Sequence, residues 1–363
     1  MKQAFSLLFS FFIFSLVSCT RVSRLPRTTA GDTAAKLVIT GPRPASIGLI
    51  GDTADVTSPV DGGVVLMGGS TDVDAAFTWM LQRSGGGDVV VIRAAGTAAY
   101  NPYINRLGKI NSVETLKIDS RELADNDTVA TIIRTAEMLF IAGGDQSNYM
   151  RYWKGTKTCD AINYLLTEKR APVGGTSAGC AILGGFYYSG ENGSAVSSEA
   201  LLDPYHKSIN VYNNDFIKAP FLQQVITDQH YLARNREGRS LVFLGRINKD
   251  WNTAASIIAV DERTAVCIDK DGKAKVFGLT SPTRPFSNAY FIASRKNREP
   301  EQLQPGKPVI WNHDQKALSV YEITASEKGN GEFDVASFSI DKAKGGKRWC
   351  WWIDNGVLVK KEQ

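Results

Sequence analysis

The chain has few of the residues on which metal and nucleic-acid sites depend. It contains three histidines and five cysteines in 363 residues. The cysteines form no C-x-x-C pair and no cluster with histidine, so a zinc site is not expected. No run of lysine and arginine with interleaved aromatic residues occurs, and the formal net charge is only +5. Nucleic acid is therefore not an expected partner.

The sequence also lacks an apolar run long enough to cross a bilayer comfortably. The nearest approach follows Met1-Lys2, where residues 4–17 are almost wholly apolar and lead into Leu16-Val17-Ser18-Cys19. A positive start, a short apolar stretch and small residues are typical of a secretory signal. The final cysteine makes this segment resemble a bacterial lipoprotein signal. That resemblance implies a lipid anchor on Cys19 and an exported, membrane-anchored protein in the periplasm or on the cell surface; an ordinary signal peptide is the alternative.

Composition and pattern divide the chain into four segments. The sequence is 43% hydrophobic and 22% charged, which is typical of a globular protein with a large core. We expect a signal peptide over 1–18, a tether and entry segment over 19–60, an α/β domain over 61–280 and a β-rich extension over 281–363. Of the four cysteines beyond the signal, Cys180 is predicted to lie in the core.

Strand and helix patterns alternate from Val64 onward. Repeated β-α units predict a mostly parallel sheet with helices on both faces. Asp72 is expected to cap a first helix that runs to Leu81. Glycine pairs end the predicted strands at 68–69, 143–144 and 174–175, so a ligand site is expected along that edge of the sheet. The strands are predicted at 64–69, 89–93, 115–118 and 138–146, and further helices over 128–136 and from Tyr149 to Leu165.

Beyond about residue 255 the pattern changes to strands of period two. Residues 256–260 and 265–268 flank Asp261-Glu262-Arg263-Thr264, which predicts a hairpin. The tryptophans near the C-terminus suit either an aromatic surface for a polymer or a position in the core. A core or edge-strand position is favoured, because large aromatic side chains bury much apolar area.

One segment carries a recognisable reaction motif. Gly175-Thr176-Ser177-Ala178-Gly179 fits G-x-S-x-G, the nucleophile-elbow pattern, and follows a short apolar run. A serine at the tip of a strand-to-helix turn has a strained backbone, so its neighbours must be small. The turn exposes the hydroxyl and directs the N–H of Ala178 toward a developing oxyanion. Ser177 is therefore the candidate nucleophile.

The shortage of histidine limits the choice of a general base. A serine nucleophile needs a base within hydrogen-bonding reach, and this is nearly always imidazole. His230 follows an apolar, β-branched run and begins a polar cluster. His206 is predicted to lie in a loop and His313 in the β-rich tail. His230 is therefore the candidate base.

Three motifs in this order resemble the cyanophycinase branch of the S51 serine peptidases, a superfamily that includes peptidase E. They are Gly143-Gly144-Asp145-Gln146, Gly174–Gly179, and Asp228-Gln229-His230 with the arginines that follow. The resemblance covers roughly residues 60–280. It implies a flavodoxin-like sheet similar to that of class I glutamine amidotransferases.

The resemblance also implies roles for individual residues. Ser177 would be the nucleophile and His230 the general base, with the N–H groups of Gly144 and Ala178 around the oxyanion. The third member would be an acid between serine and histidine, for which Glu199 is preferred and Glu191 is the alternative. No metal ion or organic cofactor is needed. The positions that would contact substrate or shape its pocket are Gln146, Asp228, Gln229, Arg234, Arg236 and Arg239.

The favoured function is that of an exported serine exopeptidase acting on acidic, aspartyl or β-aspartyl peptides. The sharpest expectation is release of β-Asp-Arg from cyanophycin through an acyl-enzyme. One alternative is an α/β-hydrolase esterase, which shares the serine motif. Another is a surface lipoprotein that binds peptides without cleaving them. Whether the protein forms a homodimer is left open.

Overall fold

The computed structural model of the chain describes residues 41–279, 287–294 and 298–363. The described residues belong to one compact unit. The predicted signal segment, Cys19 and the first half of the predicted tether lie outside the described residues.

The larger of two sheets has nine strands in the order β1-β4-β3-β5-β6-β2-β11-β12-β15. Its five central strands, from β4 to β2, are parallel. They confirm the predicted α/β class with a mostly parallel central sheet. The strands are β1 (Ser46–Gly51), β2 (Gly63–Met67), β3 (Asp88–Arg93), β4 (Ser112–Lys117), β5 (Met138–Ile141), β6 (Pro172–Thr176), β11 (Thr264–Asp269), β12 (Lys273–Gly278) and β15 (Asn330–Asp334).

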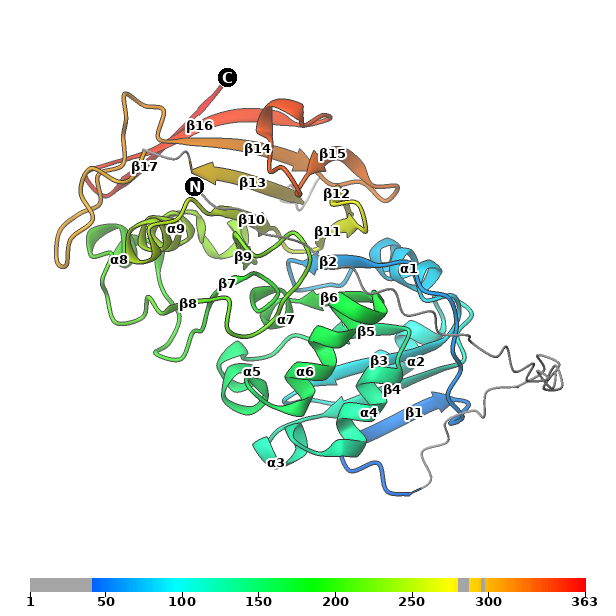
Figure 1. The fold of residues 1–363 in the computed structure, drawn as a ribbon. Coiled ribbons are helices and arrows are strands. Elements are labelled where there is room, and N and C mark those ends of the chain that lie inside the picture. Colours follow the sequence, from blue (N-terminus) through cyan, green and yellow to red (C-terminus); the bar gives the residue numbers. More distant parts are fainter. Residues whose placement is uncertain (1–40, 280–286, 295–297) are drawn as a thin grey trace, which may run out of the picture. The chain divides into compact units, whose positions relative to one another are not determined.

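Helices cover both faces of this sheet because each strand is apolar on both sides. In β2, Val64 and Leu66 pack in the same buried cluster as the helices α4, α5 and α6. Val65 and Met67 point the other way and pack with α1 and α2. Figure 1 shows these helices around the parallel strands. The helices are α1 (Asp74–Arg83), α2 (Tyr100–Asn105), α3 (Arg121–Ala124), α4 (Asp127–Thr135), α5 (Gln146–Trp153), α6 (Lys157–Tyr164) and the π-helical turn η1 (Leu165–Lys169).

The second sheet has eight strands in the order β17-β16-β14-β13-β10-β9-β7-β8. Strand β9 runs parallel to β7 and β10, and the other pairs are antiparallel. The helix α9 buries its apolar side against this sheet. The elements are β7 (Phe186–Tyr188), β8 (Val211–Asn213), β9 (Val225–Gln229), β10 (Ser256–Val260), β13 (Asn288–Ser294), β14 (Leu318–Thr324), β16 (Lys347–Asp354), β17 (Val357–Glu362), α7 (Ala178–Ala181), α8 (Ser197–Leu202), η2 (Leu232–Arg234), α9 (Glu237–Trp251) and η3 (Ile340–Lys342).

The hairpin predicted around Asp261–Thr264 is wrong. Strand β10 pairs with β9 and β13 in the second sheet, whereas β11 pairs with β2 and β12 in the first. The two strands have hairpin-like spacing, but each finds an apolar neighbour in a different sheet. The connection between them therefore passes from one sheet to the other.

The C-terminal region completes both sheets. Strands β13, β14, β16 and β17 extend the second sheet beyond β10, and β15 adds an edge to the first. Trp351 and Trp352 are buried in the cluster that includes α9. The strands after residue 280 confirm the predicted β-rich region, and these two tryptophans occupy the core.

Three local expectations differ from the structure. Residues 46–51 of the predicted tether form β1, an edge strand paired with β4. Asp72 does not cap α1; its carboxylate accepts a hydrogen bond from Tyr100 instead. The helix predicted from Tyr149 to Leu165 is divided into α5 and α6 around Gly155, which has a positive φ of 68°.

Among the helices of the described residues, none is long and apolar enough to cross a membrane.

Candidate active site

Three polar side chains are joined end to end at the carboxyl edges of both sheets. The Oγ atom of Ser177 lies 2.8 Å from Nε2 of His230. The Nδ1 atom of the same imidazole lies 2.7 Å from Oε1 of Glu262. Each residue follows the end of a strand, β6 for Ser177, β9 for His230 and β10 for Glu262. A hydroxyl, an imidazole and a carboxylate in this order form the arrangement that activates a serine nucleophile.

The turn at Ser177 has the strained backbone that its sequence predicts. Ser177 has φ 50° and ψ −114° between the end of β6 and the start of α7. A Cβ atom at Gly175 would lie 2.5 Å from backbone atoms of Gly179, and one at Gly179 would lie 2.1 Å from the carbonyl oxygen of Ile141. Only glycine fits both positions, so the small residues around the serine are required by close backbone packing.

Backbone carbonyl groups at the end of β2 accept hydrogen bonds from the three segments that carry Ser177, His230 and Glu262. The carbonyl of Met67 accepts the N–H of Ser177 at 3.1 Å, and that of Gly68 accepts the N–H of His230 at 2.8 Å. The carbonyl of Gly69 accepts the N–H of Arg263, next to Glu262, at 3.1 Å. Three consecutive carbonyl groups thus align a serine from the first sheet with a histidine and a glutamate from the second.

Gly69 is a site residue that the sequence predictions did not include. It has φ 96°, and a Cβ atom there would lie 2.5 Å from both Cε1 and Nε2 of His230. The same atom would lie 3.1 Å from Cβ of Ser177. The glycine pair at 68–69, which suggested a site at this strand end, was the available signal for this residue.

The carboxylate that contacts His230 is that of Glu262, and this corrects the prediction of Glu199. Glu199 is exposed in the first turn of α8. Glu191, the alternative, accepts hydrogen bonds from Ser189, Asn210 and Tyr212. The error arose because the acid was sought between the serine and the histidine. Strands β9 and β10 are parallel neighbours, so the residues that follow them meet at one edge.

The surroundings of His230 favour its neutral form. The imidazole is buried, with 6% of its side chain exposed. Burial lowers the pKa of His230 below its usual value, the hydrogen bond that His230 donates to Glu262 opposes this, and the charges of Arg234 and Arg236 lower the pKa further. A neutral imidazole can accept the serine proton, so the site is prepared to act as a base at neutral pH.

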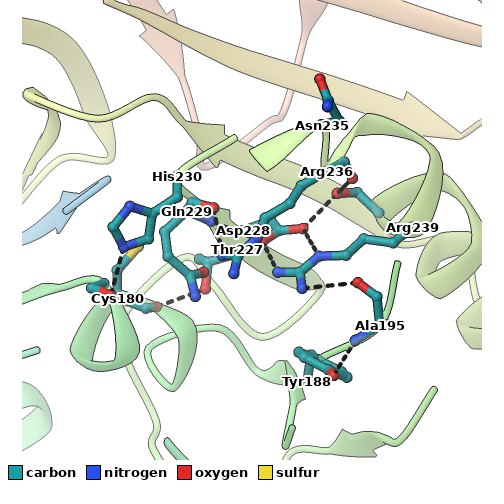
Figure 2. Close-up of polar contacts among 12 residues, drawn as sticks. Cys180, Tyr188, Ala195, Thr227, Asp228, Gln229, His230, Asn235, Arg236 and Arg239 are labelled. Carbon is teal, nitrogen blue, oxygen red and sulfur yellow. Dashed lines mark hydrogen bonds and ion pairs between the residues drawn. The ribbon is translucent and has the colours of Figure 1, made fainter. Parts of the chain in front are cut away.

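Two of the predicted substrate residues are buried against each other. Asp228 and Arg239 each have 2% of their side chain exposed and form an ion pair through both carboxylate oxygens. Ser240 donates a further hydrogen bond to Asp228 at 2.7 Å. Burial alone would raise the pKa of Asp228, but the charge and hydrogen bonds of Arg239 outweigh it and hold that pKa below its usual value. Figure 2 shows the guanidinium directed at Asp228. This pair shapes the site from within and does not face a ligand.

Of the other predicted substrate residues near His230, Arg236 and Gln229 are buried, whereas Arg234 is exposed. Arg236 is buried and donates to the carbonyl of Gln229 at 2.8 Å. Gln229 is buried as well, and its Oε1 atom has no hydrogen-bond partner among the described residues. Arg234 is exposed, and no described carboxylate forms an ion pair with it. Of the three predicted arginines, Arg234 is therefore the one available to a ligand.

The segments of the two predicted oxyanion residues lie beside the serine, and Gln146 lies at the start of a neighbouring helix. Ala178 follows it as the first residue of α7. A Cβ atom at Gly143 would lie 3.4 Å from Cβ of Ser177, so the peptide joining Gly143 to Gly144 is beside the serine. Gln146 begins α5 and faces the loop at Gly190, where a Cβ atom would lie 2.9 Å from its Nε2.

The other two histidines lie apart from the Ser177 site. The ring of His206 contacts Ser208 at 2.8 Å, and the ring of His313 contacts the carbonyl of Glu299 at 2.7 Å. Cys180 is fully buried, as predicted. Within the described part of the chain, no group of three or more His, Cys, Asp or Glu side chains is placed to hold a metal ion.

Comparison with known proteins finds a matching family and several similar proteins. The family model described as Peptidase family S51 matches residues 64–276. The cyanophycinase of Trichormus variabilis is 27% identical over 171 residues, covering 47% of this chain and 52% of that protein. The cyanophycinase of Synechococcus elongatus is 25% identical over 231 residues, covering 61% of this chain and 66% of that protein. The matches thus span between about half and two thirds of these relatives. A solved peptidase from an acI-B1 Actinobacterium has a TM-score of 0.46 and 17% identity over 62% of this chain and 90% of its own.

Proposed function

Because the chain belongs to peptidase family S51, we propose that it is a serine peptidase acting through Ser177, His230 and Glu262. The observation that supports these roles is the continuous contact from hydroxyl to imidazole to carboxylate, at 2.8 and 2.7 Å. The strained backbone of Ser177 is a second support, because such strain is kept where a serine hydroxyl must be exposed at the tip of a turn.

In the proposed reaction His230 takes the proton of Ser177 as Oγ attacks the scissile carbonyl. The carboxylate of Glu262 fixes the tautomer that leaves Nε2 free to accept this proton. The N–H groups of Ala178 and Gly144 stabilise the oxyanion, and each such donor contributes about 3–4 kcal/mol in other oxyanion holes. His230 then protonates the leaving amine, and water hydrolyses the acyl-enzyme.

The proposed substrates are peptides with a free carboxylate near the scissile bond, β-aspartyl peptides above all. Arg234 supports this choice, because it is exposed and has no carboxylate partner among the residues that the structure describes, and a guanidinium can bind a carboxylate through two parallel hydrogen bonds. The relatives described as cyanophycinases support cyanophycin as the first polymer to test. The released product would be β-Asp-Arg.

The direct test is to incubate the purified protein with cyanophycin, β-Asp-Arg and α-aspartyl dipeptides, and to follow release of free amines. Ser177→Ala is the control for the nucleophile. We expect turnover by the wild type alone, with β-Asp-Arg accumulating from cyanophycin because its own β-aspartyl bond is left intact.

Two outcomes would replace this proposal. Hydrolysis of p-nitrophenyl esters without cleavage of any aspartyl peptide would indicate an esterase. Binding of the peptides without turnover, equal in the wild type and in Ser177→Ala, would indicate a peptide-binding protein.

We further propose that the protein is exported and anchored through a lipid on Cys19. The support is the sequence pattern of residues 1–19, a positive start and a short apolar stretch ending in Leu16-Val17-Ser18-Cys19. Metabolic labelling with a radioactive fatty acid should mark the wild type and leave Cys19→Ala unlabelled. Equal labelling of both would exclude this anchor.

A further inference from the structure

The helix α5 folds back on the loop that leads into it. This loop, residues 142–145, joins β5 to α5 and carries Gly144, one of the two proposed oxyanion donors. Within the first turn of the helix, the hydroxyl of Tyr149 donates to the carbonyl of Ala142 at 2.8 Å. The proposed reaction does not otherwise use this buried hydroxyl.

The same hydroxyl packs against the other side of the loop. A Cβ atom at Gly144 would lie 2.8 Å from Oη of Tyr149, so a larger residue leaves no room for the hydroxyl. Gly144 is not among the glycines with a positive φ, so its backbone conformation does not by itself require glycine. Tyr149 therefore holds the peptide that joins Gly143 to Gly144 from the residue before it and from the residue after it.

The backbone N–H groups held in this way are available to a ligand. Those of Gly143 and Gly144 form no hydrogen bond with another described residue. Gly144 is exposed, and a Cβ atom at Gly143 would lie 3.4 Å from Cβ of Ser177. The C=O and N–H of a trans peptide point in opposite directions, so a hydrogen bond to the carbonyl of Ala142 also sets the direction of the next N–H.

Tyr149 is itself firmly held. It is 1% exposed, and its ring stacks on that of Trp153 with the centres 4.2 Å apart and 7° between the planes. The indole of Trp153 donates to the carbonyl of Ile118, directly after β4, at 2.8 Å. Burial raises the pKa of Tyr149, so the phenol keeps its proton and stays a donor at neutral pH. The helix α5 also packs against α7, which follows Ser177.

An oxyanion hole needs such support. Backbone donors stabilise a developing charge only when they are held in place before it forms. The loop contains two consecutive glycines, the residue type with the greatest backbone freedom. A side chain that fixes this loop therefore contributes to the rate without contacting the substrate.

We propose that Tyr149 is the positioning residue of the oxyanion hole, its hydroxyl holding the peptide between Gly143 and Gly144 so that the N–H of Gly144 meets the oxyanion. This role rests on the proposed peptidase function, because it acts on the reaction of Ser177.

The first test measures kcat and KM of Tyr149→Phe on a soluble cyanophycin oligomer. We expect kcat to fall by about 10–100-fold and KM to change by less than about twofold, since an oxyanion donor acts in the transition state. Tyr321→Phe is the matched control. Tyr321 is 3% exposed, and its hydroxyl accepts the N–H of Gly346 at 2.9 Å among the C-terminal strands. Both variants should lose similar stability in urea unfolding, and only Tyr149→Phe should lose kcat. Equal kcat in the two variants would overturn the positioning role.

A double-mutant cycle tests the contact at Gly144 without depending on the loss of the hydroxyl. Gly144→Ala should lower kcat, because its methyl group displaces Oη of Tyr149. The next atoms of the ring, Cζ and Cε1, lie at 3.5 and 3.9 Å, which is ordinary contact. Gly144→Ala should therefore have little further effect in Tyr149→Phe. Fully additive losses would show that the two residues act independently and would overturn the proposal.

A fluorophosphonate probe gives a readout that needs no peptide substrate. Oγ of Ser177 attacks the phosphorus, the P–F bond breaks and fluoride leaves, while His230 takes the hydroxyl proton and the phosphoryl oxygen occupies the oxyanion hole. The wild type should be labelled and Ser177→Ala should not. Labelling of Tyr149→Phe should be slower by about tenfold or more, and that of Tyr321→Phe should match the wild type.

The labelling rates separate failure of this role from failure of the peptidase proposal. Slow labelling of Tyr149→Phe, without hydrolysis of any peptide by the wild type, would reject the peptidase proposal and retain the positioning role. Equal labelling of Tyr149→Phe and the wild type would overturn the role and leave the peptidase proposal standing if peptides are cleaved. A wild type that is neither labelled nor active on peptides would reject both.

Discussion

At the scale of single side chains, the proposed chemistry depends on the protonation of His230. Its two ring nitrogens contact Ser177 and Glu262. Burial lowers the pKa of His230, the hydrogen bond donated to Glu262 raises it, and the charges of Arg234 and Arg236 lower it again. The folded protein therefore keeps the imidazole neutral to a pH below the usual value of about 6.5. The effect of each neighbour on the pKa of His230 can be tested through the acid limb of the dependence of kcat/KM on pH.

Glu262→Gln should lower kcat/KM for a β-aspartyl peptide by about 10²–10⁴-fold, since an amide no longer selects the required tautomer. Glu262 raises the pKa of His230, so its removal should also move the acid limb to lower pH. The measurement is kcat/KM between pH 4 and 8. Glu199→Gln is the control, because Glu199 is exposed on α8 and should leave rate and limb unchanged. A loss of activity in Glu199→Gln, with none in Glu262→Gln, would instead support Glu199, the acid predicted from sequence.

Arg234→Gln should shift the acid limb in the opposite direction, to higher pH. The charge of Arg234 lowers the pKa of His230, so without it the imidazole binds its proton more tightly and becomes active only at higher pH. The same kcat/KM profile measures the shift. Arg234 is exposed, so added salt should reduce the difference between the two profiles. An acid limb that does not move would show that Arg234 has no electrostatic influence on the site.

At the scale of elements, the end of β2 aligns segments from two sheets. Its last carbonyl and those of Gly68 and Gly69 accept the N–H groups of Ser177, His230 and Arg263. This edge is closely packed, since a Cβ atom at Gly68 would lie 1.8 Å from the carbonyl oxygen of Asp261. Small changes here should affect the alignment of the reacting groups more than the stability of the fold.

Gly69→Ala should abolish most activity, because its methyl group would collide with the ring of His230. Gly155→Ala is the control for backbone strain. Gly155 also has a positive φ, of 68°, but no atom lies within 4 Å of its Cβ position. Both variants should lose similar stability in urea unfolding, and only Gly69→Ala should lose kcat. Equal activity in the two variants would show that the close contact at Gly69 is unimportant.

The ion pair between β9 and α9 should matter for stability. Arg239→Met leaves the carboxylate of Asp228 buried and unpaired, which costs about 3–5 kcal/mol in comparable pairs. Asp228→Asn/Arg239→Met should recover part of this loss. Urea unfolding measures both variants. Arg246→Met, which breaks an i,i+4 pair with Asp250 on the same helix, should cost less than about 1 kcal/mol. Similar losses for the two single variants would argue against a charge effect at Arg239.

At the scale of the whole molecule, hydrogen bonds to Asp261 connect the C-terminal strands to the active-site segments. Asp261, one residue before Glu262, is fully buried. Its carboxylate accepts the N–H of Leu232, close to His230, and that of Asn288, the first residue of β13. Burial raises the pKa of Asp261 to about 7, although these two hydrogen bonds oppose the shift. One titrating group thus links the proposed site to the region after residue 280.

This link predicts how stability depends on pH. An unfolded aspartate has a pKa of about 3.9, so between about pH 4 and pH 7 the folded protein holds a proton that the unfolded chain releases. Asp261 therefore stabilises the fold less as pH rises through this range. Melting temperatures from pH 4 to 8 should fall more steeply with pH in the wild type than in Asp261→Asn. Parallel curves would show that Asp261 does not titrate in this range.

Much of the fold and two of the three proposed catalytic residues were predictable from local pattern. The motif at Ser177 and the shortage of histidine identified the two residues that lie 2.8 Å apart. Glu262 and Gly69 were missed. Glu262 lies two residues after the end of a correctly predicted strand, but the partner of that strand, β10, was taken to be β11, whereas β10 pairs with β9 and β13. Asp228 and Arg239 were predicted either to contact substrate or to shape its pocket, and the sequence could not choose between these roles, because a charged motif has the same pattern whether it faces solvent or pairs internally.

By itself the sequence determined the α/β alternation, the small-residue turn at Ser177 and the choice of His230. These follow from hydrophobic periodicity and from the backbone demands of a tight turn, which act over a few neighbouring residues. The tertiary structure alone decided that Glu262 contacts His230, that Arg239 is buried and that Arg234 is exposed, with no ion pair to another described residue. Those outcomes depend on which strands become neighbours and which charges lose water, and both are set by packing between segments far apart in the chain.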